Sequence, residues 1–288
     1  MARQTAEQVT EGVDLSGKTA LVTGVNSGIG AETMRVLALR GATVIGTARS
    51  EEKAAQACAA CPGDTLPLAC ELTDLASVRA CVDAIGVRPL DIVVANAGIM
   101  ALPTLEQVRG IEKQFATNHL GHFLLITSLL DNVQAAPDAR IAIVSSAAHM
   151  RAPKAGIDFD NLSGEQSYSG WQAYAQSKLA NVLFANELAR RLDPGVIVNS
   201  LHPGLIRTNL GRNMKGPLML ALGLVMLPFM ISVAQGAATS CYVATSPEVA
   251  GITGRYFADC ALARSNPLAS ERELAERLWS ESTTLTAQ

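Results

Sequence analysis

Short apolar runs alternate with longer amphipathic stretches along most of the chain after Lys18. The runs expected to form strands are 19–23, 42–47, 66–70, 90–95, 140–145 and 196–200. The stretches between them favour helices that end at Arg40, that cover 51–61, 75–85 and 105–131, and that end at Leu192. Regular alternation indicates βαβ units, and strands rich in Val and Ile indicate burial on both faces. We therefore predict an α/β fold, a doubly wound parallel sheet with helices on both faces.

The composition fits one large globular unit. Of the 288 residues, 49% are hydrophobic and 17% are charged, and the formal net charge is −3. We expect a polar N-terminal extension over residues 1–16 and a single domain over residues 17–288. Nothing in the charge pattern favours a nucleic-acid partner. Because residues 1–16 contain no apolar signal segment, we expect a cytoplasmic protein.

The cysteines give no sign of a metal centre. They are Cys58, Cys61, Cys70, Cys81, Cys241 and Cys260. Cys58 and Cys61 form a C-x-x-C pair, but no second pair and no pair of histidines follows at metal-ligand spacing. We expect reduced thiols and no metal site.

A glycine-rich turn follows the first expected strand. Residues 23–30 read Thr-Gly-Val-Asn-Ser-Gly-Ile-Gly and lead directly into a helix. Glycines allow a tight turn, and the free N–H groups of a helix N-terminus bind a pyrophosphate. Such a turn can also be purely structural, but its place after the first strand favours dinucleotide binding and a Rossmann fold. The candidate contacts are Gly24, Asn26, Ser27, Gly28, Ile29 and Gly30.

The residue after the second strand bears on the choice of dinucleotide. An acidic side chain there binds the free 2′-hydroxyl of NAD, whereas an arginine pairs with the 2′-phosphate of NADP. Arg49 occupies this place, and Glu51 and Glu52 fall in the first turn of the next helix, where the helix dipole favours them. A solvated surface arginine is the alternative interpretation. We expect NADP(H) to be preferred, with NAD(H) also able to bind.

The later strand ends also carry small or polar residues. These are Asn96, Ala97 and Gly98 after the fourth strand, Ser146 after the fifth, and Pro203, Gly204 and Thr208 after the sixth. Ligands bind beyond the carboxyl ends of the strands in such sheets. Small residues let a flat ligand approach the backbone, and the serine hydroxyl can bind a substrate oxygen. No Ser-His-Asp arrangement accompanies Ser146, so it is not expected to be acylated.

Asn118 lies inside an expected helix, where its side chain competes with the backbone for hydrogen bonds. Its presence suggests a polar task or a kink. His119 and His122 are interpreted as packing residues, because no carboxylate or third histidine stands nearby in a metal-ligand pattern.

Tyr174 and Lys178 stand four residues apart in the last expected helix, on one helix face. A phenol titrates near pH 10, and a fixed ammonium one turn away favours its anion. Such a tyrosine can exchange a proton with an alcohol or a carbonyl near neutral pH. The same spacing also occurs by chance in many amphipathic helices.

Residues 216–231 form a run that is almost entirely apolar but contains Gly223 and Pro228. The run is too short and too broken for a good membrane span. We favour a helix pair that closes over an apolar pocket. A buried core segment and a peripheral membrane contact are the alternative interpretations. We expect residues 205–232 to act as a mobile lid over the substrate.

The motifs resemble, in order, those of the short-chain dehydrogenase/reductase family. They are Thr23-Gly24 with Gly28-Ile29-Gly30, Asn96-Ala97-Gly98, Asn118, Ser146, Tyr174 with Lys178, and Pro203-Gly204. The resemblance covers about residues 15–279. Residues 118–123, 145–149, 177–181 and 254–260 look like the retinol dehydrogenase branch, including the oxidoreductase domain of WW-domain oxidoreductases.

The resemblance implies roles for these residues. Tyr174 is the general acid/base, and Lys178 lowers its pKa and binds the nicotinamide ribose. Ser146 holds the substrate oxygen, and Asn118 kinks its helix and positions a water of the proton relay. Glu71 and Leu72 lie beside the adenine, with Glu71 where the family usually has Asp. The family's use of the Tyr-Lys helix in dimers implies a homodimer or homotetramer.

These observations predict an NADP(H)-dependent oxidoreductase that interconverts an alcohol with an aldehyde or ketone on an apolar small molecule. Substrate specificity is expected in the loops at about 150–170 and 205–232. The resemblance does not extend to retinol itself, because the chain lacks the N-terminal membrane helix of many retinol dehydrogenases. A catalytically idle NADP(H)-binding regulatory protein is the alternative, although it would not need the whole set of Asn118, Ser146, Tyr174 and Lys178. A membrane-surface protein that uses residues 216–231 is a third hypothesis.

Overall fold

The computed structural model describes residues 3–204 and 230–287. Its main sheet has the order β10-β9-β8-β7-β4-β1-β2-β3, and every pairing is parallel except that of β9 with β10. The strands are β1 (Thr19–Thr23), β2 (Thr43–Ala48), β3 (Thr65–Ala69), β4 (Ile92–Ala95), β7 (Arg140–Val144), β8 (Ile197–His202), β9 (Arg255–Ala258) and β10 (Ala261–Leu262). The order reverses between β1 and β4, as in a Rossmann fold, so the predicted fold class is confirmed.

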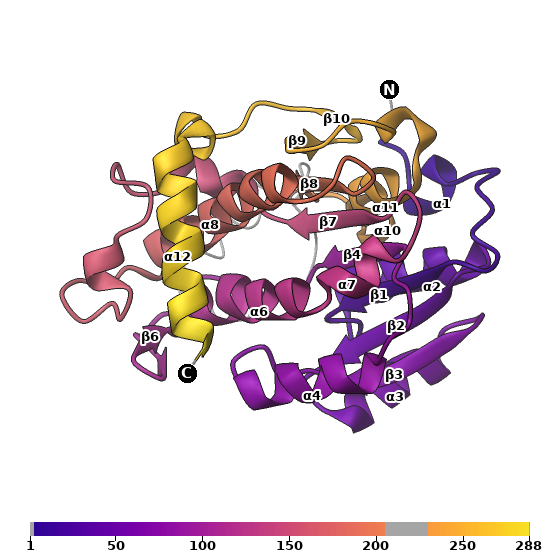
Figure 1. The fold of residues 1–288 in the computed structure, drawn as a ribbon, viewed down its shortest axis with the longest axis horizontal. Coiled ribbons are helices and arrows are strands. Elements are labelled where there is room, and N and C mark those ends of the chain that lie inside the picture. The colour runs from indigo at the N-terminus through magenta and orange to yellow at the C-terminus, as the bar shows by residue number, and fades with distance from the viewer. Residues whose placement is uncertain (1–2, 205–229, 288) are drawn as a thin grey trace.

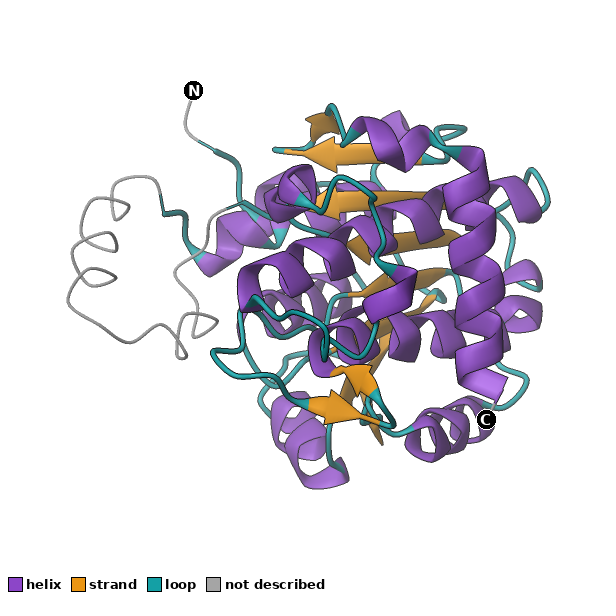
Figure 2. Ribbon diagram, turned by 90° about the vertical axis from the view of Figure 1, so that its left-hand side faces the viewer, coloured by secondary structure: helices purple, strands orange, loops and turns teal. Residues whose placement is uncertain are grey.

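Helices cover both faces of this sheet (Figures 1 and 2). They are α1 (Ala6–Val9), α2 (Gly28–Leu39), α3 (Glu51–Ala59), α4 (Leu75–Ile85), α5 (Lys113–Phe115), α6 (Gly121–Ser128), α7 (Leu130–Gln134), α8 (Gly170–Arg191), α10 (Val233–Gly236), α11 (Ala238–Thr245) and α12 (Arg272–Ala287). Short 3-10 turns cover Ala147–Arg151, Phe159–Asn161, Pro247–Val249 and Pro267–Ser270.

Alternate residues along each strand point into different cores, as expected for a pleated sheet. In β1, Leu21 joins an apolar cluster with α4, α6 and α8. Its neighbours Ala20 and Val22 join a second cluster with α2, α3 and α11. The strands are thus covered on both faces, which explains why their sequences are almost continuously apolar.

The expected long helix over 105–131 begins later than predicted. A small hairpin of β5 (Gln107–Val108) and β6 (Ile111–Glu112) comes first. Its turn contains Arg109 at φ 51° and Gly110 at φ 73°, both in the left-handed region that two-residue hairpin turns require. The Glu112 carboxylate then accepts from the Phe115 N–H at 2.8 Å and starts the helix. The prediction was wrong here because the hairpin is too short to show strand periodicity.

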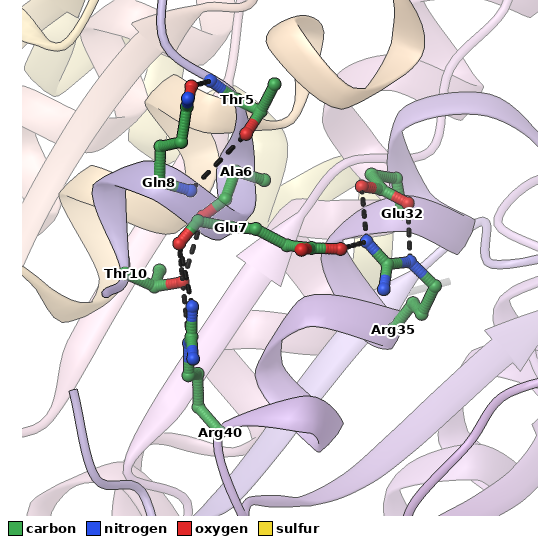
Figure 3. A network of polar contacts seen from close by, with 8 residues as sticks. All are labelled: Thr5, Ala6, Glu7, Gln8, Thr10, Glu32, Arg35 and Arg40. Carbon is green, nitrogen blue, oxygen red and sulfur yellow. Dashed lines mark hydrogen bonds and ion pairs between the residues drawn. The ribbon is translucent and has the colours of Figure 1, made fainter. Parts of the chain in front are cut away.

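The N-terminal segment, expected only to be polar, contains a helix that the sequence did not predict. Thr5 and Gln8 form a capping box at the start of α1, and Ala6 is fully buried. Arg40 donates to the Glu7 carbonyl and to the Thr10 hydroxyl at 2.7 and 3.0 Å (Figure 3). Arg35 pairs with both Glu7 and Glu32. These contacts fasten α1 to α2, the helix that follows the glycine turn.

Candidate active site

The glycine turn after β1 is a compact loop that larger residues would disrupt. Gly24 and Gly28 have φ values of 74° and 60°. A Cβ atom at Gly30 would lie 2.3 Å from the Gly24 carbonyl oxygen and 2.5 Å from Nδ2 of Asn96. The turn therefore depends on the absence of side chains, which is the property that a closely bound ligand needs.

The N-terminus of α2 is open to a ligand. Its N-cap residue Ser27 makes no side-chain capping bond, so the N–H groups of the first turn keep their bonding capacity. Asn26 and Ser27 are exposed, whereas the side chain of Ile29 packs in an apolar cluster with Ala6. Of the predicted contacts in this turn, Ile29 can therefore offer only its backbone. The uncapped N-terminus and the glycine loop fit the pyrophosphate of a dinucleotide.

The end of β2 presents the basic residue that the sequence indicated. Arg49 is exposed and has no hydrogen-bond or ion-pair partner among the described residues. Ser50 caps α3 by accepting from the Lys53 N–H, and Glu51 and Glu52 lie in the first turn. A hollow of about 660 Å³ beside the glycine turn is lined in part by Asn26, Gly28 and Lys53.

The ends of β1 and β4 are joined where the strand order reverses. The Thr23 hydroxyl accepts from the N–H groups of Asn96 and Ala97 at 2.9 and 3.0 Å. Because these bonds use both of its lone pairs, the hydroxyl donates its proton to Nε2 of His122 at 2.8 Å. The Asn96 side chain donates to the Thr23 carbonyl at 2.8 Å. The strand ends therefore form one hydrogen-bonded platform.

The helix that contains Asn118 is locally distorted. Residues Ala116–Leu120 form a π-helical turn between α5 and α6, a feature that often marks functional sites. The Asn118 amide exchanges hydrogen bonds with the backbone of Ile99 at 2.8 and 2.9 Å, and it donates to the Ser177 hydroxyl at 2.9 Å. Asn118 thus links the segment after β4 to α8, in agreement with a polar task and a distorted helix.

Ser146, Tyr174 and Lys178 come together at the ends of β7 and α8. Ser146 lies close enough to Tyr174 to lower the pKa of its hydroxyl. The Lys178 amine lies 5.8 Å from the centre of the Tyr174 ring and donates to the Val144 carbonyl at 3.0 Å. The Ser145 hydroxyl donates to the Lys178 carbonyl at 2.7 Å, which ties β7 to α8.

Burial dominates the titration of these groups. It raises the pKa of Tyr174, and the nearby Ser146 side chain opposes this rise. It lowers the pKa of Lys178 to about 8. The expected lowering of the Tyr174 pKa by Lys178 is therefore not the leading effect in this structure, because both groups are taken out of water.

The remaining predicted residues are placed less uniformly. A Cβ atom at Gly98 would lie 3.5 Å from the Lys178 amine, so the end of β4 reaches the reacting side. The Glu71 carboxylate bonds to the N–H and hydroxyl of Thr73 at 3.2 and 2.9 Å, and Leu72 is buried. Pro203 and Gly204 follow β8 directly, and Gly204 has φ 94°. Thr208, the run 216–231 and nearly all of the expected lid lie outside the described residues.

Some residues of the site escaped the sequence reasoning. His122 bridges the Thr23 hydroxyl to the Asn118 carbonyl, to which its Nδ1 bonds at 3.1 Å. Burial lowers the pKa of His122 to about 4, so it is neutral. His149 bonds through Nδ1 to the Ser146 carbonyl at 2.6 Å and through Nε2 to the Asn266 N–H at 3.1 Å. The only sequence signal for either histidine is its spacing from Asn118 or Ser146.

In the described part of the chain, no group of three or more His, Cys, Asp or Glu side chains is arranged to hold a metal ion. Among the described helices, none combines the length and the apolar character that crossing a bilayer requires.

Comparisons with known proteins agree with this geometry. Residues 18–217 match the short chain dehydrogenase family. The chain is 42% identical to human (Homo sapiens) retinol dehydrogenase 14 over 288 residues, which cover 92% of this chain and 85% of the relative. It is also 42% identical to the chloroplastic short-chain dehydrogenase TIC 32 B of Brassica napus over 298 residues, with 96% and 90% covered.

Solved structures give the same result. An uncharacterized protein from Mycobacterium paratuberculosis superposes with a TM-score of 0.80 at 32% identity, over 100% of this chain and 98% of that chain. A short chain dehydrogenase from Burkholderia cenocepacia in complex with NADP superposes with a TM-score of 0.68 at 28% identity, over 85% and 96%.

Proposed function

The chain belongs to the short-chain dehydrogenase/reductase family, in its retinol dehydrogenase-like branch, and from this premise we propose an NADP(H)-dependent interconversion of an alcohol and a carbonyl on an apolar small molecule. Family membership makes the protein an oxidoreductase that uses NAD(P) and acts on CH–OH or C=O groups of small molecules. The observation that carries the finer proposal is that Ser146, Tyr174 and the buried Lys178 lie together, with the Lys178 amine 5.8 Å from the centre of the Tyr174 ring.

A bound nicotinamide would supply or accept the hydride at the carbinol carbon. The two hydroxyls of Ser146 and Tyr174 hold the substrate oxygen between them, which orients the carbon and stabilises the charge that develops on oxygen. In the oxidation direction, Tyr174 accepts the proton of the alcohol; in reduction it donates a proton to the carbonyl oxygen. Burial of the site keeps water away from this exchange, because Tyr174 and Lys178 are 8% and 4% exposed.

Lys178 acts on both Tyr174 and the cofactor in this proposal. Its amine is held by the Val144 carbonyl at 3.0 Å, so its remaining N–H groups are free to bind the nicotinamide ribose. In its charged form it favours the Tyr174 phenolate. Asn118, anchored to Ile99 and Ser177, positions a water of the proton relay.

The residues that would hold the cofactor stand at the carboxyl ends of the strands. The glycine turn and the first turn of α2 would hold the pyrophosphate, and Asn96, Ala97 and Gly98 would border the nicotinamide half. Arg49, exposed and without a described partner, pairs with the 2′-phosphate, and Lys53 one turn into α3 adds a second positive charge nearby. Glu71, Leu72, Pro203, Gly204 and Thr208 complete the proposed set.

An apolar substrate is favoured by the side chains around the reacting hydroxyls. Trp171 precedes Tyr174 by three residues on α8, and the two rings lie 6.4 Å apart. Met150 follows Ser146 by four residues. Trp171 is 48% exposed and Met150 is 49% exposed. Each lies three or four residues along the chain from a proposed reacting residue. An apolar substrate would cover them, so its binding is favoured by the hydrophobic effect.

The same family resemblance supports a homodimer or homotetramer, because the Tyr-Lys helix serves dimer packing in the family. A cytoplasmic location is proposed from the free cysteines. A regulatory protein that only senses NADP(H) is not favoured. Such a protein needs the nucleotide turn but has no use for Ser146 and Tyr174 placed together beside Lys178.

A substrate panel tests the proposal. Purified protein is mixed with apolar alcohols, aldehydes and ketones and with each cofactor, and the nicotinamide absorbance is followed. We expect turnover with several apolar compounds and lower KM values for NADP(H) than for NAD(H). A protein that binds NADP(H) but turns over no member of the panel would favour the sensor alternative, and flotation with liposomes separates the membrane-surface alternative.

A further inference from the structure

A chain of buried polar groups leads from the last helix to Lys178. It begins at Ser282 on α12, which crosses over α8 and α6 at one end of the molecule (Figure 1). The Ser282 hydroxyl bonds to Nε2 of His119 at 2.8 Å. His119 lies in the π-helical turn and packs among the rings of Phe115, Phe123 and Phe184. None of these groups touches the reacting oxygen.

The next member is Asn181, one turn after Lys178 on α8. Its Nδ2 donates to the Val144 carbonyl at 3.1 Å, which fixes the orientation of the amide. Oδ1 of Asn181 and Nδ1 of His119 are buried without a hydrogen-bond partner among the described residues, and Asn181 lies close enough to His119 to raise the pKa of its ring. Ser282, His119 and Asn181 are each at most 1% exposed, so an unpaired atom here would be costly.

The neighbouring groups also indicate which nitrogen of His119 carries the proton. Burial lowers the pKa of His119 to about 3, so the ring is neutral and has a single N–H. Because Oδ1 of Asn181 can only accept, the proton lies on Nδ1. Nε2 then accepts from the Ser282 hydroxyl. With this tautomer the Nδ1 proton is on the side of the ring that is not used by Ser282.

The series ends on the same atom that holds the lysine. The Val144 carbonyl accepts from Lys178 at 3.0 Å and from Asn181 at 3.1 Å. A carbonyl oxygen has two lone pairs, so the two hydrogen bonds use both of them and fix the direction of the carbonyl. The direction of the carbonyl in turn determines where the other N–H groups of Lys178 point, on the side where Gly98 approaches the amine.

We propose that Asn181 is a positioning residue for Lys178, and that His119 and Ser282 keep its amide in the orientation that this task requires. The inference rests on the proposed function of Lys178. Asn181 acts through the Val144 carbonyl and touches neither substrate nor cofactor. Removing its amide leaves one lone pair of the carbonyl without a donor and lets the lysine amine shift. Cofactor affinity and turnover should both fall, while the apolar substrate binds as before.

Substitutions on α8 provide the first test. Asn181→Leu keeps the volume and removes the hydrogen bond to the Val144 carbonyl. Asn186→Leu is the matched control, because Asn186 lies on the same helix and also donates to a backbone carbonyl, that of Ala269 at 2.7 Å. We expect Asn181→Leu to weaken NADPH binding, measured by nicotinamide fluorescence, and to lower kcat, each about fivefold to tenfold, with an unchanged KM for substrate. Asn186→Leu should leave all three unchanged.

Substitutions on α12 provide an independent test if Asn181→Leu does not fold. Ser282→Ala removes the hydroxyl that sets the His119 tautomer, whereas Ser282→Thr keeps it. Thr286→Val is the matched control, since Thr286 is also buried on α12 but donates to the Ser282 carbonyl at 2.7 Å, away from His119. We expect Ser282→Ala to weaken NADPH binding and lower kcat about threefold. Ser282→Thr and Thr286→Val should resemble the wild type.

The outcomes separate this inference from the proposed function. If the wild type is active and Lys178→Met is impaired, but Asn181→Leu matches Asn186→Leu and Ser282→Ala matches Thr286→Val, the positioning role is wrong and the function stands. If the wild type binds neither nicotinamide cofactor, both are wrong.

Discussion

The glycine turn of residues 23–30 and the pocket around Lys178 lie at the same edge of the sheet but are built differently. The turn consists of consecutive residues, and it depends on close backbone contacts such as that between Gly30 and Gly24. The pocket collects buried side chains from the π-helical turn, from the end of β7 and from α8, and hydrogen bonds hold Asn118, Ser145 and Lys178 in place.

The two regions differ in how much desolvation opposes their folding. The turn leaves its polar residues Asn26 and Ser27 exposed, so little desolvation opposes its folding. The pocket removes Tyr174 and Lys178 from water. Burial raises the pKa of Tyr174 and lowers that of Lys178, so the neutral form of each is favoured. Substitutions in the turn should therefore act through backbone fit, whereas those in the pocket should act through proton exchange and charge.

The largest expected effect is on the chemistry of the pocket. Tyr174→Phe keeps the ring and removes the proton exchange, so kcat should fall at least about 100-fold while cofactor affinity and thermal stability stay close to wild type. Tyr242→Phe is the control, because Tyr242 bonds to Glu248 at 2.7 Å outside the proposed site. A Tyr174→Phe protein that folds normally and turns over at the wild-type rate would contradict the mechanism.

The second effect concerns stability and pH. Burial lowers the pKa of Lys178 from 10.5 to about 8, so the unfolded chain binds a proton more tightly than the folded one. Below pH 8 the lysine is charged in both states, so the folded protein bears the full cost of desolvating the charge. Between about pH 8 and 10.5 the folded lysine is neutral while the unfolded one is still charged, so the free energy of unfolding rises with pH. Lys178→Met should therefore stabilise the protein at pH 7, by up to about 3 kcal/mol.

Urea unfolding of wild type and Lys178→Met at several pH values measures this effect. The advantage of the variant should shrink as the pH rises through the window above, and its turnover and cofactor affinity should both be lower than those of the wild type. A Lys178→Met protein that is less stable than the wild type at pH 7 would show that the hydrogen bond to Val144 outweighs the desolvation of the charge.

The third effect tests the turn. A Cβ atom at Gly30 would lie 2.3 Å from the Gly24 carbonyl oxygen, so Gly30→Ala must displace backbone. We expect a loss of about 1–3 kcal/mol in the free energy of unfolding and weaker binding of NADPH. Gly195→Ala is the control, because no atom lies within 4 Å of a Cβ atom there. Equal stabilities of the two variants would argue against a turn held by close backbone contact.

The smallest effect concerns cofactor choice at the edge of the turn. Arg49→Ala should reduce the preference for NADPH over NADH about tenfold, since a charge-assisted bond to phosphate contributes about 1.5–3 kcal/mol. The two dissociation constants, measured by fluorescence titration, give the preference. Arg40→Ala offers a contrast, because Arg40 bonds to Glu7 and Thr10 and should affect stability without changing the preference. A wild type that binds NADH more tightly would contradict the assignment of Arg49.

Much of the fold could be read from the sequence because its signals are local. The apolar runs predicted β1, β2, β3, β4, β7 and β8 to within about two residues, and their alternation with helices predicted the parallel sheet, which the structure confirms. The hairpin of β5 and β6, the strands β9 and β10 and the helices α1, α10, α11 and α12 were not predicted. Except for α11 and α12, these elements are too short to show periodicity, and α1 is stabilised by tertiary contacts such as that of Arg40 with Glu7.

The candidate site, too, was predicted from the sequence only in part. The order of small and polar residues at the strand ends, with Tyr174 and Lys178 four apart, determined the family and the group of residues to examine, because parallel strands bring their carboxyl ends to one edge. Only the tertiary structure decided that burial shifts the pKa values of Tyr174 and Lys178, that His122 joins Thr23 to Asn118, and that Asn181 shares the Val144 carbonyl with Lys178. The physical reason is that desolvation and hydrogen-bond partners depend on neighbours distant in sequence, such as Ser282 and His119, which are 163 residues apart.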